Sequence, residues 1–108
     1  MLKEIKQIRL RISKTQSIEK LDMLYKIMFK KEEAVYEQCG YPDLFLHKAC
    51  HDEFIRTITS AQDQIRTHKL TRKDLLEYIK LWTKRHEEVN DRISMAFVRT
   101  KQLIGETS

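Results

Sequence analysis

The sequence has little of what interrupts helices: 108 residues include only two glycines and one proline. Strand-rich chains need frequent turns built on these residues, so their scarcity favours long helices. The chain also lacks any run of about twenty apolar residues, and residues 1–6 lack the continuous apolar segment of a signal peptide. We therefore expect no membrane span and a cytoplasmic location.

Cysteine and unbalanced charge are also scarce. Two cysteines, Cys39 and Cys50, are expected to be reduced thiols in a chain without a leader, and we assign them no ligand role. The net charge is only +5, and residues of both signs are interspersed over 34% of the sequence. This pattern is typical of a solvated helical surface, so a nucleic-acid partner is not favoured. The length suits one domain, residues 1–108.

Apolar residues recur every three or four positions in four segments, which predicts four amphipathic helices. Ser17 and Thr71 are suitable N-caps, and Gly40 is a suitable C-terminal stop. The predicted helices cover about residues 2–12, 18–38, 42–66 and 71–103, with Pro42 in the first turn of the third. Short connections predict an all-α, antiparallel up-down-up-down four-helix bundle with a short first helix.

Polar, metal-capable residues fall on the predicted buried faces. The faces of the last three helices are Leu21, Leu24, Tyr25, Met28, Glu32 and Val35; Leu44, His47, His51, Phe54, Ile55, Ile58 and Ile65; and Leu75, Tyr78, Ile79, Trp82, His86, Val89 and Ile93. Burying a carboxylate and three imidazoles without partners costs several kcal/mol. These groups must therefore satisfy one another, hold water or bind a metal.

Metal binding is the interpretation we favour. His47 and His51 are four residues apart and project from consecutive turns of one helix face, so both can reach one ion. Glu32 comes from a second helix, and His86 with Asp91 from a third. Imidazoles mixed with carboxylates, and no convincing thiolate, suit iron, manganese or zinc. The alternative is a set of hydrogen-bonded core histidines, and the remaining histidine, His68, is expected to be solvated in a turn.

The order of these motifs resembles the hemerythrin family, particularly its bacterial members. The motifs are Phe-x2-Glu-Glu at residues 29–33, Gly-Tyr-Pro at 40–42, His-x3-His-x2-Phe at 47–54 and Trp-x3-His-x4-Asp at 82–91. The resemblance implies a bundle with a non-haem di-iron centre that binds O2 reversibly. It also implies that His47, His51 and His86 ligate the first iron while Glu32 and Asp91 bridge the pair.

Two departures from the family pattern concern the second iron. Met28 stands where the family has a histidine, and no histidine precedes His47. A thioether is a poor ligand for a hard iron ion, so the resemblance implies one intact site and one depleted site, which leaves a mononuclear centre open. Glu4 could donate a carboxylate, although an exposed Glu is the favoured interpretation.

The first helix is expected to fall short of the site. With a tight connection at residues 13–17, the turn facing Met28 falls at about Met1, so the front half of the helix is expected to be missing. The apolar surface left uncovered could be covered by a homodimer, by a folded-back C-terminal segment or by residues upstream of Met1.

Three functions are compared. The first is a hemerythrin-like iron protein for O2 or NO binding, sensing or iron handling. The alternative is a metal-free helical interaction module that binds a protein or acidic partner through basic residues. These are Arg9, Arg11, Lys14, Lys30, Lys31, Lys69, Arg72, Lys73, Lys84 and Arg85. An enzyme is not expected, because no nucleophile is matched with a base.

Overall fold

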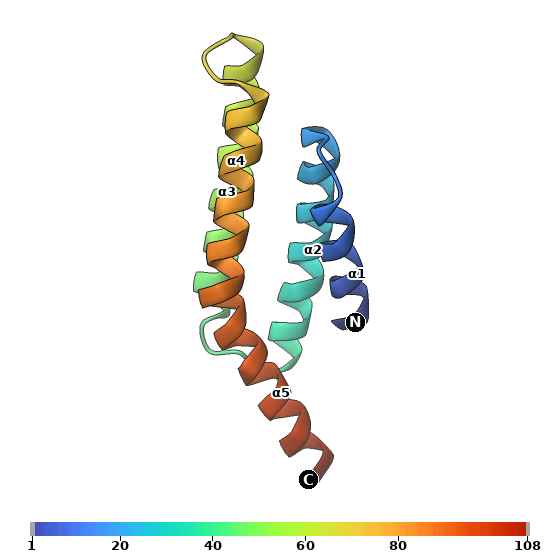
Figure 1. Ribbon diagram of the computed structural model, residues 1–108. Helices are drawn as coiled ribbons and strands as arrows, with labels where there is room; N and C mark the ends of the chain where they lie inside the picture. The colour runs from blue at the N-terminus through green and yellow to red at the C-terminus, as the bar shows by residue number, and fades with distance from the viewer. Residues whose placement is uncertain (1, 108) are drawn as a thin grey trace.

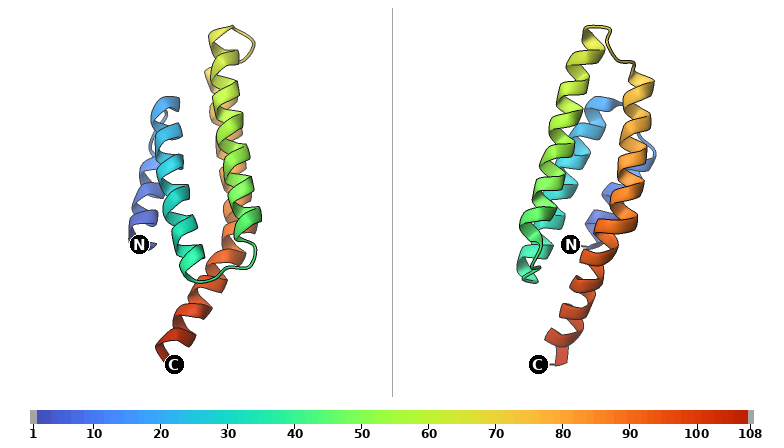
Figure 2. Two further views of the ribbon diagram at one scale, coloured as in Figure 1. Left: turned by 180° about the vertical axis from the view of Figure 1, so that it is seen from behind. Right: turned by 90° about the vertical axis from the view of Figure 1, so that its left-hand side faces the viewer.

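The computed structural model describes residues 2–107, with side chains described for residues 2–104. Its helices are α1 (Leu2–Ser13), α2 (Ile18–Gln38), α3 (Leu44–Arg66), α4 (Arg72–His86), the π-helix η1 (Glu87–Asp91) and α5 (Arg92–Thr107). Figures 1 and 2 show that α4, η1 and α5 form one long rod, which packs with α1, α2 and α3. The described chain is an all-α four-helix bundle, as predicted, and α1 is short.

The ends of α2 and the start of α4 lie where the sequence predicts, but Pro42 lies in the turn before α3, which begins at Leu44, and not in its first helical turn. The Ser17 side chain caps α2 by accepting a hydrogen bond from the backbone N–H of Lys20, and Thr71 caps α4 in the same way through Asp74. Gly40 has a φ of 68°, and the chain after α2 closes with the Tyr41 N–H donating to the Tyr36 carbonyl. This is the left-handed turn that glycine adopts without strain.

The connection between α1 and α2 differs from the expected tight turn. Residues 15–17 are not helical, and Figure 1 shows this segment running alongside the start of α2 before the chain turns. Ser17 is extended, and three residues outside a helix span at most about 10 Å, which equals about seven residues of helix rise. The connection therefore displaces α1 along α2 toward the middle of the bundle. Glu4 lies beside Lys31 and Arg9 reaches Glu32.

The prediction that α1 falls short of the predicted metal site is therefore wrong, because Arg9 of α1 contacts Glu32. Met1 itself lies outside the described residues, but the helix that follows it already reaches the site. Within residues 2–107, the C-terminal segment also does not fold back over the bundle. Figures 1 and 2 show α5 continuing beyond the other helices, away from the bundle.

The π-helix η1 changes which residues of the last rod face inward. In a regular α-helix, residues five apart point about 140° away from each other, whereas a π-helix with i→i+5 bonds stacks them. Asp91 is therefore buried on the same side as His86, and Ser94 and Val98 follow it inward. The predicted buried residues Val89 and Ile93 are instead 54% and 60% exposed.

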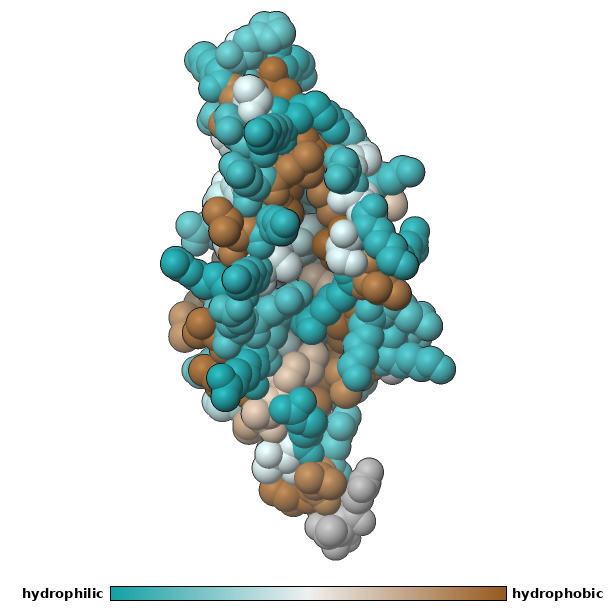
Figure 3. Space-filling view, in the orientation of Figure 1, coloured by the Kyte–Doolittle hydropathy of each residue, from teal (hydrophilic) through white to brown (hydrophobic). Residues whose placement is uncertain are grey.

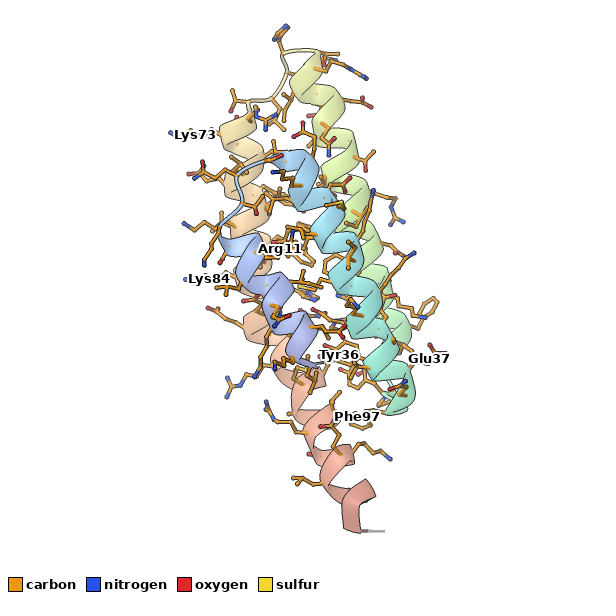
Figure 4. All side chains as sticks on the ribbon, turned by 90° about the vertical axis from the view of Figure 1, so that its right-hand side faces the viewer. Arg11, Tyr36, Glu37, Lys73, Lys84 and Phe97 are labelled. Carbon is orange, nitrogen blue, oxygen red and sulfur yellow. The ribbon has the colours of Figure 1, made fainter. Side chains whose placement is uncertain are left out.

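The apolar core fills the bundle on both sides of the polar cluster. Its largest fully buried members are Tyr25, Tyr36, Phe54, Ile5, Ile18, Ile58 and Leu75. Figure 4 shows Tyr36 and Phe97 near the end where α2 meets α5, and Lys73 and Lys84 extending away from the bundle on α4. Within the described part of the chain, no helix has the length and apolar character needed to cross a lipid bilayer.

Candidate metal centre

All five predicted ligands converge at one place inside the bundle. We call Glu32, His47, His51, His86 and Asp91 the ligand cluster; their exposed fractions are between 0% and 6%. They come from α2, α3, α4 and η1. Two overlapping groups, the three histidines and the set of Glu32, His47 and Asp91, each place their ligand atoms within 4.8 Å of one another. The structure thus brings the five side chains together, and their role as metal ligands stays a prediction.

One atom of each cluster residue is buried without a hydrogen-bond partner among the described residues. These atoms are Oε2 of Glu32, Oδ1 of Asp91 and Nε2 of His47, His51 and His86. Leaving a buried polar atom unsatisfied costs about 1–3 kcal/mol, so five in one place form an expensive arrangement. The three imidazole nitrogens form one group of donors, and Glu32, His47 and Asp91 form a second group that shares His47 with the first. Nitrogen and oxygen donors of these kinds suit a divalent metal ion.

The distances between these atoms are those expected of ligands that share a metal ion. Asp91 Oδ1 lies 3.2 Å from His86 Nε2 and 3.5 Å from His47 Nε2. Glu32 Oε2 lies 3.7 Å from His51 Nε2 and 3.9 Å from His47 Nε2. Two ligands with metal bonds of about 2.1 Å at angles of about 90–120° lie about 3.0–3.6 Å apart. The cluster is close to this spacing without rearrangement of the helices.

Each imidazole of the cluster is in contact with an aromatic ring. Phe29 stacks on His51 with ring centroids 3.7 Å apart and planes within 4°. Trp82, one turn before His86, stacks on it at 4.4 Å and 13°. The ring of Tyr36 meets His47 edge-on at 4.8 Å. These contacts fix the ring planes, which gives Phe29 and Trp82 of the sequence motifs a physical role.

Glu33 contacts His51 at Nδ1, the ring nitrogen opposite the one that faces the ligand cluster. The His51 Nδ1 lies 2.8 Å from Glu33 Oε2, so a neutral imidazole donates its Nδ1–H and leaves the lone pair of Nε2 facing the centre. Burial, reinforced by His47 and His86, lowers the pKa of His51 to about 2, which keeps the ring neutral at ordinary pH. Burial raises the pKa of Glu33, whereas nearby Lys48 opposes this shift.

Arg9 also reaches the ligand cluster, which the sequence analysis missed. Its Nη2 lies 3.2 Å from Glu32 Oε1 and 3.1 Å from Asp91 Oδ2, and its Nε lies 3.9 Å from Glu87 Oε1. Burial alone would lower the pKa of Arg9, but the carboxylates outweigh it and raise the pKa further. The interpretation of Arg9 as part of the basic surface is therefore wrong, because helix periodicity does not show how far α1 is displaced along α2.

The other candidates are placed away from the cluster centre. Glu4 is exposed and pairs with Lys31 at 2.8 Å, so the favoured interpretation of Glu4 is confirmed. His68 is exposed in the turn between α3 and α4, where its φ is 62°. Met28 is buried at 4% exposure and lies at the wall of a cavity beside Arg9.

This cavity of about 540 Å³ opens between α4 and the α1–α2 pair. Met28, Tyr25 and Ile79 contribute to its apolar wall, while Arg9 and Glu87 lie at its polar side. Figure 3 shows apolar residues along this seam between hydrophilic residues on both sides. The cavity exists because the displaced α1 leaves the upper part of α2 covered only by the non-helical connection. It is large enough to admit a small molecule to the Arg9 side of the cluster.

Comparison with protein-family models, curated proteins and solved structures gives no match for this chain.

Proposed function

We propose that this chain is a hemerythrin-like metal-binding protein that holds iron and serves in the binding or sensing of O2, NO or another small diatomic ligand, or in iron handling. The observation that supports it is the set of five buried ligand atoms without hydrogen-bond partners. Imidazole nitrogens combined with carboxylate oxygens suit iron, with manganese and zinc as competitors. Glu32, His47, His51, His86 and Asp91 would hold the ion.

The proposal is for a binding function rather than an enzyme. A bound iron ion would supply coordination positions for a diatomic ligand, and the chain's own residues would hold the iron ion and shield it from solvent. A hydrogen bond from the His51 Nδ1–H to Glu33 would leave Nε2 free to ligate the ion, and Phe29 and Trp82 stack on two of the imidazoles. Met28 at the second-iron position is the reason that we propose one intact iron site and one depleted site.

The first test is anaerobic reconstitution of metal-free protein with ferrous ion, followed by elemental analysis and an absorption spectrum after exposure to air. We expect tightly bound iron in the wild type and its loss in His51→Ala, which removes a central ligand. His68→Asn is the matched control, because His68 is exposed and Asn tolerates a positive φ. Protein that takes up neither iron, manganese nor zinc would contradict the proposal.

Such a failure would favour the alternative, a metal-free interaction module that binds an acidic partner. Salt-dependent retention of metal-free protein on an acidic ligand would then be the expected behaviour. A homodimer stays a prediction from the sequence, and light scattering of the purified chain tests it.

A further inference from the structure

The two carboxylates of the ligand cluster each use their two oxygens differently, one toward the imidazoles and one toward Arg9. Oε2 of Glu32 lies near His47 and His51, and Oδ1 of Asp91 lies near His47 and His86; neither oxygen has a hydrogen-bond partner among the residues that the structure describes. Their other oxygens, Oε1 of Glu32 and Oδ2 of Asp91, accept hydrogen bonds from the same atom, Nη2 of Arg9. Each carboxylate therefore has one oxygen near the imidazoles and its other oxygen bound to the guanidinium of Arg9.

We propose that Arg9 is a built-in second cation, which limits this centre to one metal ion and holds both bridging carboxylates in place. This inference rests on the proposed metal-binding function. Arg9 is a positioning residue that acts through Glu32 and Asp91, since it carries no lone pair that could ligate a metal. The guanidinium is permanently charged and offers several donors in one plane, so it can serve two carboxylates at once.

The local charge also balances with a single divalent ion. Glu32, Asp91 and the partly exposed Glu87 supply three negative charges around Arg9. One guanidinium and one divalent ion neutralise them, whereas a second divalent ion beside Arg9 would leave two uncompensated positive charges in a largely buried site. Uncompensated buried charge is strongly unfavourable, so Arg9 and a second ion exclude each other.

The ligand set around Arg9 indicates what its removal should do. Without the guanidinium, Glu32 and Asp91 would each present a free carboxylate oxygen to the same space, with Glu87 close by. Arg9→Glu adds a further carboxylate there, and oxygen-rich sites of this kind bind divalent ions. The variant is therefore expected to gain a second ion position that the wild type lacks.

The experiment measures the number of ions bound when metal-free protein is titrated with Co²⁺ or with Mn²⁺, under anaerobic conditions. Wild-type protein should bind one ion, and bound Mn²⁺ should give the spectrum of an isolated ion in electron paramagnetic resonance. Arg9→Glu should bind two ions, with the Mn²⁺ signal altered by coupling through the shared carboxylates. Arg9→Lys keeps the charge and should again bind one.

Arg11→Glu is the matched control, because Arg11 lies on the same helix, is exposed and undergoes the same charge change. It should bind one ion. Arg9→Gln removes the charge but keeps a hydrogen-bonding side chain, so it covers the case in which Arg9→Glu does not fold. Circular dichroism with and without Co²⁺ identifies that case.

The outcomes separate the two proposals. Wild-type protein that binds no ion contradicts the metal-binding function itself. Wild-type protein that binds two ions, or Arg9→Glu and Arg9→Gln variants that fold and still bind one, overturns the role of Arg9 while the metal-binding function stands.

Discussion

Burial of His51 should make the metal-free protein lose stability as the pH falls from about 7 to about 5. The imidazole is 1% exposed, and its pKa is lowered from 6.5 to about 2 by burial and by His47 and His86. The unfolded chain has an ordinary histidine pKa, so it binds a proton that the folded chain excludes. The stabilisation is complete above about pH 6.5 and is lost progressively toward pH 2.

The size of the effect follows from this difference in proton binding. One excluded proton changes the free energy of unfolding by about 1.4 kcal/mol per pH unit below the unfolded pKa. Between pH 7 and pH 5, His51 should therefore cost about 2 kcal/mol, a large part of the about 5–15 kcal/mol that stabilises a typical domain. Glu33, whose pKa is raised, acts in the opposite direction at lower pH.

Urea unfolding followed by circular dichroism, in the presence of a chelator, measures this dependence at about pH 7, 6 and 5. His51→Gln keeps a donor for Glu33 but cannot take up the proton. The free energy of unfolding of this variant should therefore decrease less steeply as the pH is lowered. His68→Asn removes an exposed histidine and should keep the wild-type slope. A wild-type stability that is flat between pH 7 and 5, or an equal slope in His51→Gln, would refute the reasoning.

Two further predictions concern the support of the site. Glu33→Gln weakens the orientation of His51 and should reduce metal affinity about 10–100-fold in a competition titration, while exposed Glu37→Gln one turn later should leave it unchanged. Deleting exposed Val89 converts η1 to a regular α-helical turn and places Asp91 four residues after His86, so metal binding should persist. As a control, deleting exposed Glu53 in α3 should unfold the chain, because the deletion rotates Phe54 away from the core. Loss of metal binding on deletion of Val89 would show that η1 itself is required.

The four helices and most of the ligand cluster follow from local patterns. The spacing of His47 and His51 fixes two imidazoles on one face of α3, and the apolar stripe around them points that face inward. Ser17, Gly40 and Thr71 set helix ends through hydrogen bonds within a few residues. Such interactions depend only on neighbours in the sequence, and this is why they were predicted correctly.

The register of the last rod was not predictable in the same way. A regular 3.6-residue period carried past His86 places Val89 and Ile93 inward, but the structure exposes both. The π-helix inserts one extra residue, and its cost is offset by burial of Asp91 beside the histidines and of Ser94, which donates a hydrogen bond to the Tyr36 hydroxyl. Those compensating contacts come from other helices, so the local pattern does not contain them.

The sequence by itself determined that four amphipathic helices would bury a carboxylate among histidines, because hydrophobic periodicity is a property of each helix alone. Only the tertiary structure decided that Arg9 faces these carboxylates, that Glu33 holds His51 and that a cavity opens beside Met28. Each of these depends on how far one helix is displaced along another, and that displacement is set by the non-helical residues 15–17 and by packing across the bundle.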